Sequence, residues 1–413
     1  MSSAPRLEVI NTGTELLHGN VLNTHLSFLA QQVFLIGLRV QRQTTIPDGE
    51  AIRDSILESA TRCEIVLITG GLGPTTDDIT REIVAELTNR PLLYDESIFQ
   101  RIKERFQKRG LRLTDRISRQ AYVPEGAVVL PNDFGTAPGL YIPTRNGIPH
   151  LLLFPGPPRE LIPMFTTYAI PVLRDLVPRN DLHARIFRTT GIGESYVEKM
   201  VGKELLAIPG LEVGYCARLR EVDVRVVGDQ PAVEAAEKIM RAALGENIYG
   251  AGTKELEEIV FELLRDTGST LAVAESCTGG QLADRLTNVP GASAVFLEGN
   301  VTYSNEAKTR ILGVPSEFFA SFGAVSEQVA RAMAEGARER SGAGYSLSTT
   351  GVAGPAGGTP EKPVGTVYIG LAGENLITRA ERLFFPTDRQ SFKRICTQQA
   401  LDMLRREILK REF

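Results

Sequence analysis

The sequence predicts an α/β protein with a parallel-sheet domain at 1–172, a small α/β domain at 173–252 and a second α/β domain at 253–413. Short apolar runs with β-branched residues alternate with helix-like segments, which is typical of sheets covered by helices. Several of these runs end in glycine-rich segments that also carry hydroxyl or carboxylate side chains. At 413 residues the chain is long enough for two or three domains, each with its own core.

Composition and charge argue against several classes of function. A net charge of -4 and a pI near 5.8 argue against direct nucleic-acid binding, which normally needs a basic surface. The four cysteines form no CxxC pair or Cys/His cluster, so we expect reduced thiols and exclude a conventional zinc site. Residues 1–6 lack the apolar core of a signal peptide, and no apolar run reaches membrane-spanning length. We therefore expect a soluble, cytoplasmic protein.

The first domain is expected to be a parallel sheet with helices on both faces. Its strands are predicted at 6–11, 39–45, 64–69, 140–143 and 151–154, and its helices at 20–36, 49–62 and 78–87. Ligands bind at the carboxyl ends of the strands in such folds. The unusual residues lie at those ends, since TGTE follows the first strand and a glycine-rich segment follows the third.

That glycine-rich segment, residues 70–80, reads GGLGPTTDDIT and has the composition of a phosphate-binding loop. Glycines let the backbone approach a phosphate closely, and threonine hydroxyls add hydrogen-bond donors. Asp77 and Asp78 are two adjacent carboxylates, which suit a hard cation such as Mg²⁺. The alternative is that these aspartates only cap the helix that follows. We favour the phosphate and metal site, because a cap needs no approach rich in glycine and threonine.

Four motifs in this domain, TGTELLHGN, TGGLGPTTDDIT, NDFGTAPG and FPGPPRE, resemble the N-terminal half of the CinA family. That half shares its fold with the molybdopterin-binding proteins MoaB and MogA. The resemblance implies hydrolysis of ADP-ribose to AMP and ribose 5-phosphate with a divalent cation (Mg²⁺, Mn²⁺ or Co²⁺). The metal or water would be organised by Glu15, Asp77 and Asp78, and the substrate bound by Gly70, Gly71, Gly73, Thr75 and Asn132. His25 stands where relatives usually carry asparagine, and its simplest interpretation is an exposed helical side chain.

The middle domain is expected to be an open α/β sandwich and resembles the KH-like linker domain of full-length CinA proteins. Its strands are predicted at 183–190, 212–217, 223–227 and 247–249, and its helices at 193–206 and 230–244. Gly191-Ile192-Gly193-Glu194 resembles the GXXG loop of RNA-binding domains, but Glu194 stands where a phosphate clamp needs a cation. A spacer or dimerisation module is the favoured role, and the family resemblance implies a homodimer.

The C-terminal domain carries a nucleophile pattern. Its strands are predicted at 270–274, 294–301, 345–350, 364–371 and 380–385, and its helices at 255–267, 281–288, 326–340 and 388–410. Ser276 follows the first strand, just before a glycine-rich helix start whose backbone N–H groups can stabilise an anion. All four histidines precede this domain, so the candidate base is Lys308, since a desolvated amine can lose its proton near neutral pH.

The residues alone leave two interpretations open. Tyr303 and Lys308 both follow the strand predicted at 294–301, and active groups gather at strand ends in α/β folds. The alternative is that Ser276 merely caps the following helix and Lys308 is solvated. Cys277 is a rival nucleophile, but it ranks below the serine because no histidine supports its thiolate.

The motifs AESCTGG, GNVTYSNEAK, TTGVAGPAGG and KPVGTVYIG resemble the C-terminal domain of the CinA family, which also occurs alone as PncC-type nicotinamide-mononucleotide amidohydrolase. The resemblance implies a serine amidase that acts on the carboxamide of the nucleotide without a cofactor. Ser276 would be the nucleophile, Lys308 the base and Tyr303 a proton relay or orienting group. Substrate binding is expected from Thr278, Gly279, Gly280, Thr350, Gly351, Gly354 and Arg389.

The first hypothesis is therefore a two-site enzyme of pyridine-nucleotide salvage, with nicotinamide mononucleotide and ADP-ribose as substrates. One alternative is that the N-terminal domain only binds a pterin or nucleotide and the chain serves as a scaffold. Another is a partner role in competence or DNA recombination, although the acidic pI counts against direct DNA contact.

Overall fold

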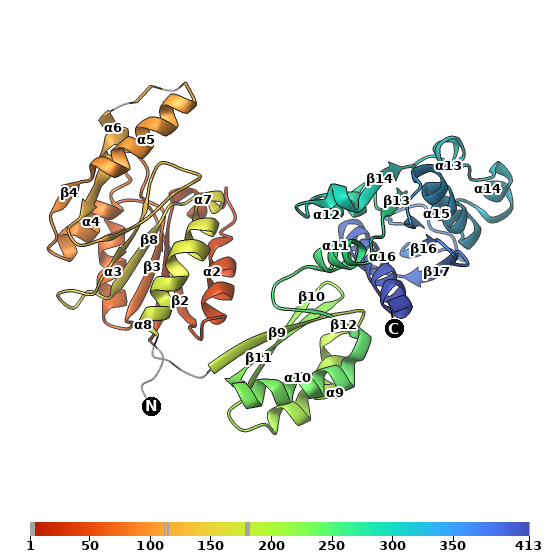
Figure 1. The fold of residues 1–413 in the computed structure, drawn as a ribbon, viewed down its shortest axis with the longest axis horizontal. Coiled ribbons are helices and arrows are strands. Elements are labelled where there is room, and N and C mark those ends of the chain that lie inside the picture. The colour runs from red at the N-terminus through yellow and green to blue at the C-terminus, as the bar shows by residue number, and fades with distance from the viewer. Residues whose placement is uncertain (1–4, 111, 114, 178–181, 413) are drawn as a thin grey trace. The chain divides into compact units, whose positions relative to one another are not determined.

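The computed structural model describes residues 5–110, 112, 113, 115–177 and 182–412. The chain divides into two compact units, Met1–Ala184 and Arg185–Phe413 (Figure 1). Helix α8 (Ile170–Leu176) runs across residue 172, where the sequence placed the end of the first domain. Its proline lies in the first helical turn, where the missing N–H is tolerated, so the helix continues through that position.

The first unit is built on a mixed sheet with the strand order β2-β1-β3-β8-β7-β6. The strands from β2 to β8 in this order run parallel, whereas β7 and β6 are antiparallel to their neighbours. A separate antiparallel pair, β4 and β5, lies outside this sheet. The strands are β1 (Leu7–Thr12), β2 (Val40–Ile46), β3 (Ile65–Thr69), β4 (Leu92–Tyr94), β5 (Tyr122–Pro124), β6 (Val128–Leu130), β7 (Gly139–Ile142) and β8 (His150–Phe154).

Alternate residues of β3 face two separate cores, because successive side chains of a strand point to opposite faces. Val66 and Ile68 pack with α3, α4 and α5, whereas Ile65 and Leu67 pack with α2, α7 and α8 (Figure 1). Burial on both faces explains why this strand is apolar throughout except for its final threonine. The helices are α1 (Thr14–Leu17), α2 (His25–Phe34), α3 (Ala51–Ala60), α4 (Thr80–Leu87), α5 (Glu96–Lys108), α6 (Asp115–Ser118), α7 (Pro158–Met164) and α8, with short η turns at Arg119–Ala121 and Phe165–Ala169.

The second unit begins with a small sheet of strand order β10-β11-β9-β12. Helices α9 and α10 pack on it through one apolar cluster that includes Val201, Val224 and Met240. This arrangement is the predicted KH-like α/β layer. Its elements are β9 (Leu182–Thr190), α9 (Glu194–Leu206), β10 (Glu212–Arg218), β11 (Glu221–Asp229), α10 (Gln230–Leu244), η3 (Gly245–Asn247) and β12 (Ile248–Ala251).

The rest of the second unit is organised around a sheet of strand order β14-β13-β15-β16-β17. β13 is parallel to both of its neighbours, whereas β16 is antiparallel to β15 and β17. The strands are β13 (Leu271–Glu275), β14 (Phe296–Val301), β15 (Tyr345–Gly351), β16 (Thr366–Gly373) and β17 (Arg379–Phe384). The helices are α11 (Leu256–Asp266), α12 (Gln281–Thr287), η4 (Ala292–Ala294), α13 (Asn305–Leu312), α14 (Ser316–Phe322), α15 (Glu327–Ser341) and α16 (Arg389–Glu412).

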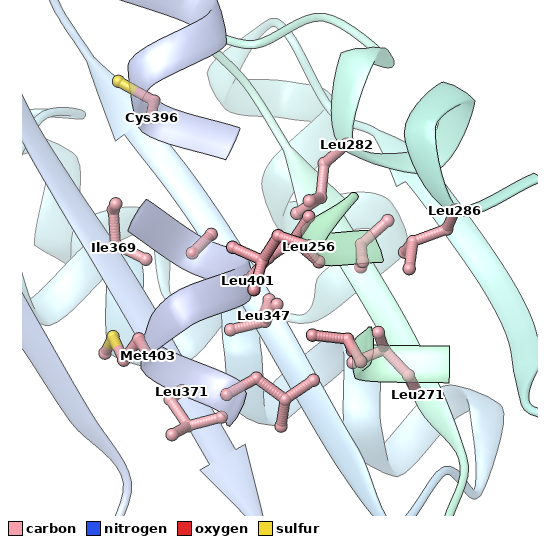
Figure 2. Close-up of a cluster of buried hydrophobic side chains, with 14 of the residues drawn as sticks. Leu256, Leu271, Leu282, Leu286, Leu347, Ile369, Leu371, Cys396, Leu401 and Met403 are labelled. Carbon is pink, nitrogen blue, oxygen red and sulfur yellow. The ribbon is translucent and has the colours of Figure 1, made fainter. Parts of the chain in front are cut away.

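Both faces of this sheet are covered. Figure 2 shows the larger core, in which Leu401 of α16 and Leu256 of α11 lie against strand residues such as Leu347. The opposite face packs against α13 and α15 through Leu312 and Met333. Burial on both faces leaves the strand ends as the places where polar side chains can gather. Among the described residues, no helix is both long enough and apolar enough to cross a membrane.

Candidate active site

The register of the C-terminal sheet brings three strand ends together. Glu275, the last residue of β13, lies beside Val301 of β14 on one side and Thr349 of β15 on the other. Ser276 follows directly, and its backbone N–H donates to the carbonyl oxygen of Thr349 at 2.9 Å. The serine side chain is half-buried, so it lies at the edge of the sheet rather than in its core.

Lys308 reaches this edge from α13, whose N-terminus is capped by the hydroxyl of Ser304. Its side chain is only 1 % exposed. The Nζ atom lies 3.1 Å from Ser276 Oγ and donates to the carbonyl oxygens of Thr302 at 2.9 Å and Tyr303 at 3.1 Å. The structure therefore brings the predicted nucleophile and base within hydrogen-bond distance, and Lys308 is not solvated.

The surroundings of Lys308 shift its protonation equilibrium toward the uncharged amine. Burial lowers its pKa, while the more distant Cys277 and Glu306 oppose that shift. A neutral amine has two N–H donors and one lone pair, whereas an ammonium has three donors and no acceptor. Two carbonyl oxygens take two donors, so the third position, which faces Ser276 Oγ, is where the lone pair of a neutral amine would lie.

A cavity of about 200 Å³ opens beside this pair. The predicted residues that line it are Ser276, Tyr303, Lys308, Thr350, Gly351 and Arg389. Arg389 is held by hydrogen bonds from its guanidinium to the carbonyl oxygen of Gly354 at 2.9 Å and the hydroxyl of Tyr303 at 3.0 Å. The Tyr303 hydroxyl thus contacts Arg389 rather than the serine or the lysine, which fits the predicted orienting role better than the proton relay.

The start of α12 is organised by a carboxylate that the sequence analysis did not single out. Glu275 is fully buried and accepts the backbone N–H groups of Gly280, Leu282 and Ala283 at 3.0, 3.0 and 2.8 Å. The N–H of Gly280 is therefore engaged and cannot serve the predicted oxyanion site. The described residues accept no hydrogen bond from the N–H groups of Cys277, Thr278 and Gly279, which remain the available donors.

The other residues predicted to bind substrate differ in their solvent exposure. Gly279 is exposed and Gly280 half-exposed, whereas Thr278 is buried with its hydroxyl 2.7 Å from that of Thr349. The hydroxyl of Thr350 donates to the carbonyl oxygen of Ala324 at 2.8 Å. Both threonine side chains thus have protein partners, and they shape the site rather than present free hydroxyls.

Cys277 lines the cavity, but its thiol belongs to the core. Burial and the contact with Cys277 raise the pKa of Cys396, so the two sulfur atoms lie close together in an apolar setting. Such an environment disfavours the thiolate of Cys396. The ranking of Ser276 above Cys277 as the nucleophile is consistent with this geometry.

In the first unit, backbone conformation and close packing explain the glycines of the segment at 70–80. Gly70 and Gly71 have φ values of +100° and +66°, which favour glycine. A Cβ on Gly71 would collide with the hydroxyl of Thr80, and one on Gly73 would collide with Asp78. The first two glycines are also buried, so the loop folds back on its own strands.

Asp77 and Asp78 do not cap helix α4. Helix α4 begins at Thr80 rather than near Asp78, and its N-cap residue is Ile79. The carboxylate of Asp78 accepts the backbone N–H of Thr75 at 2.9 Å and also the Thr75 hydroxyl. Asp77 is exposed, and a hydrogen bond with Thr75 lowers its pKa.

The predicted metal set is not assembled. Glu15 lies exposed on the short helix α1, and the described part of the chain contains no group of three or more His, Cys, Asp or Glu side chains that could hold a metal ion. Asp78 is turned toward its own loop, which accounts for its loss from such a group. The structure does not bring Glu15, Asp77 and Asp78 together as such a group, and their joint role in holding a cation stays a prediction.

Asn132 acts as the organiser of its own loop. Its amide nitrogen donates to the carbonyl oxygen of Ala137 at 2.7 Å and to Glu160 Oε2 at 2.9 Å. Its amide oxygen accepts the N–H groups of Phe134 and Gly135. The side chain is saturated by these bonds, so the structure does not support its predicted role as a direct substrate ligand.

Two buried polar residues beside the glycine-rich segment were not anticipated. His25 is buried rather than exposed, with Nδ1 3.0 Å from the Thr69 hydroxyl, and burial lowers its pKa. Arg81 of α4 is 1 % exposed, and its Nε and Nη1 atoms have no hydrogen-bond partner among the described residues. A charged side chain in the first turn of a surface helix is normally solvated. The sequence therefore gives no indication that Arg81 is buried.

Three family models together cover most of the chain. They are the probable molybdopterin binding domain at residues 8–175, the damage-inducible protein CinA KH domain at 184–250 and the CinA C-terminal domain at 253–408. A CinA-like protein of Akkermansia muciniphila is 46% identical over 396 residues, which are 96% of each chain. A putative competence-damage inducible protein of Caldicellulosiruptor saccharolyticus is 41% identical over 97% of this chain and 99% of its own. The crystal structure of a competence/damage inducible protein from Agrobacterium tumefaciens matches at 40% identity and a TM-score of 0.35, covering 37% of this chain and 94% of that one.

Proposed function

The chain belongs to the CinA family, and we propose that its C-terminal site hydrolyses the carboxamide of nicotinamide mononucleotide to nicotinate mononucleotide and ammonia. The observation that carries the proposal is the 3.1 Å approach of the buried Lys308 Nζ to Ser276 Oγ. A lysine buried beside a serine at the mouth of a cavity is the arrangement expected of an activated nucleophile.

The first half of the reaction forms an ester. Ser276 Oγ attacks the carboxamide carbon while Lys308 takes the hydroxyl proton, which leaves a tetrahedral oxyanion. The N–H groups of Cys277, Thr278 and Gly279 are the candidate donors to that oxyanion. The protonated Lys308 then gives its proton to the departing nitrogen, so that ammonia leaves and the acyl group stays on the serine.

The second half regenerates the enzyme. Lys308, neutral again, takes a proton from a water molecule that attacks the ester carbon, and it returns that proton to Ser276 Oγ as nicotinate mononucleotide leaves. Arg389 lines the same cavity as this pair and is proposed to bind the phosphate of the nucleotide. Its contacts with Gly354 and Tyr303 hold the guanidinium in place before substrate arrives.

The test is ammonia release from nicotinamide mononucleotide by the full chain and by three variants. Ser276→Ala and Lys308→Met should abolish release while circular dichroism and thermal unfolding still show a folded protein. Cys277→Ala is the matched control at the neighbouring residue and should keep its activity. Undiminished release in either of the first two variants, or its loss only in the cysteine variant, would refute the assignment.

We also propose that the first unit hydrolyses ADP-ribose to AMP and ribose 5-phosphate. Support comes from the position of the glycine-rich segment at the carboxyl ends of parallel strands, and from the nearby Arg81, whose Nε and Nη1 atoms have no described hydrogen-bond partner. Because the carboxylates do not form a metal group, the need for a cation is a question for the assay. AMP release should be measured with Mg²⁺, Mn²⁺ or Co²⁺ and with a chelator. A bound pterin on the purified protein and no AMP would favour the binding-scaffold alternative.

A further inference from the structure

A second cavity lies within the second unit, away from Ser276. It has a volume of about 350 Å³, compared with about 200 Å³ for the cavity at the serine. Gly191, Arg220 and Asn247 line it from the small sheet, and residues of β17 and α16 line it from the larger domain. Arg389 opens α16 at the serine cavity, whereas Arg406 lies 17 residues further along, which corresponds to roughly 25 Å of helix. The two cavities are therefore separate sites.

Cations predominate in the lining of this second cavity. They are Arg220, Arg379, Arg406 and Lys410, against the carboxylates of Glu381 and Asp402. Asp402 is nearly fully buried and already accepts hydrogen bonds from Arg405 at 2.6 Å and Arg406 at 2.8 Å. Its charge is thus compensated and does not make the cavity negative.

Two of the four cations that line the cavity form no ion pair with a described carboxylate. Arg379 is bound to Glu407 at 2.5 Å and lies 4.0 Å from Glu381, so its charge is shared with carboxylates. Neither Arg220 nor Lys410 lies within ion-pair distance of a described carboxylate. An anion entering the cavity would therefore meet two positive side chains that no described carboxylate neutralises.

Arg220 is held in position before any ligand arrives. It forms the turn between β10 and β11 with φ +63°, a left-handed conformation that is uncommon for a residue other than glycine. Its carbonyl oxygen accepts the N–H of Gly191 at 3.1 Å, and its guanidinium lies 5.3 Å from the centroid of the Phe385 ring. Strained backbone that is fixed by its surroundings is often found at binding sites. The guanidinium therefore bridges the small sheet and the larger domain at the cavity.

We propose that this cavity binds a small phosphorylated metabolite, with Arg220 and Lys410 contacting the phosphate. Arginine and lysine are the usual partners of phosphate oxygens, and the volume is in the range of small-molecule pockets. Leu383 and Met403 supply an apolar wall for the carbon part of the ligand. A nucleic-acid strand is disfavoured, because the carboxylates of Glu194 and Glu246 flank the same turns and would repel its phosphates.

The experiment is isothermal titration of the full chain with sn-glycerol 3-phosphate and with inorganic phosphate. The affinity should fall roughly tenfold to a hundredfold in the variant Arg220→Ala/Lys410→Ala, as expected for lost hydrogen bonds to a charged group. Arg265→Ala is the matched control, since Arg265 lies 5.8 Å from the Phe261 ring centroid but lines neither cavity. Because Arg389 is proposed to bind phosphate at the serine cavity, the titrations are also run in an Arg389→Ala background, where the heat reports the second cavity alone.

Lys410→Glu is an independent test if the turn that contains Arg220 does not tolerate alanine. It should weaken the binding of both probes and leave thermal unfolding and ammonia release as in the parent chain. Equal affinity in the parent chain and the double variant would overturn the proposal, as would the absence of saturable heat with either probe. Binding of a single-stranded oligonucleotide, with no binding of the two phosphates, would overturn it in favour of a nucleic-acid surface.

Discussion

Lys308→Met tests the proposed chemistry through both activity and stability. Methionine keeps the length of the side chain but removes the amine, so the general base is lost while the core remains filled. Loss of a positioned general base typically costs about 10²–10⁴-fold in rate. We expect ammonia release to fall by at least that factor, measured with saturating nicotinamide mononucleotide.

The same variant reports the charge of Lys308 through the pH dependence of unfolding. Burial lowers the lysine pKa below its usual 10.5 in the folded state, so the unfolded chain binds more protons between the two pKa values. The free energy of unfolding of the parent chain therefore rises with pH in that window, by up to about 1.4 kcal/mol per pH unit. In Lys308→Met this term is absent.

The remaining cost of Lys308→Met does not vary with pH. Removing the amine leaves the carbonyl oxygens of Thr302 and Tyr303 without their donor, at about 1–3 kcal/mol for each one that stays buried. Urea denaturation of both proteins at several pH values separates the two contributions. The stability difference, parent minus variant, should increase as the pH rises toward the unfolded pKa of lysine. A difference that is flat with pH would show that Lys308 has the same charge folded and unfolded, and the neutral-amine mechanism would fail.

Three further predictions concern single positions. Arg389→Gln should lower kcat/KM for nicotinamide mononucleotide by roughly tenfold to a hundredfold. It should barely change kcat/KM for nicotinamide riboside, which lacks the phosphate. An equal effect on both substrates would argue against phosphate binding. Glu275→Gln should lower the free energy of unfolding by about 1–3 kcal/mol, because its carboxylate holds three N–H groups at the start of α12; unchanged urea denaturation would contradict this. Gly71→Ala should destabilise the first unit by about 1 kcal/mol or more, because its φ is +66° and the methyl group meets Thr80; calorimetry should show an altered transition while ammonia release persists.

The order of strands and helices was largely predictable, because hydrophobic periodicity is a local property of the chain. The predicted strand at 270–274 corresponds to β13, and the predicted helix at 230–244 coincides with α10. One departure was 20–36, which contains the shorter helix α2 preceded by a loop, and α5 and the β4–β5 pair were not predicted. Gly19 and Asn20 near its start favour a turn, and the helix forms only where Leu29 and Val33 reach the core.

The candidate site was predictable in part for a similar reason. Ser276, Tyr303 and Lys308 follow strand ends, and the register of parallel strands brings such ends to one edge. The direction of a side chain is not local, however. Asp78 turns to Thr75 instead of joining Glu15, because its own loop supplies both a backbone N–H and a hydroxyl donor. Spacing along the chain cannot reveal that choice.

Glu275 illustrates how a structural residue and a catalytic one share a strand end. A buried carboxylate requires hydrogen-bond donors, and the first turn of α12 supplies three of them. These hydrogen bonds fix the turn that contains Ser276. The N–H groups of that turn that have no partner then lie in the short stretch next to the serine. Lys308 is fixed by a comparable principle, since two carbonyl oxygens saturate its N–H donors and leave one direction open toward the serine. The proposed nucleophile is thus positioned by the carboxylate of Glu275, and the proposed base lies within hydrogen-bond distance of it, so that neither role requires a histidine.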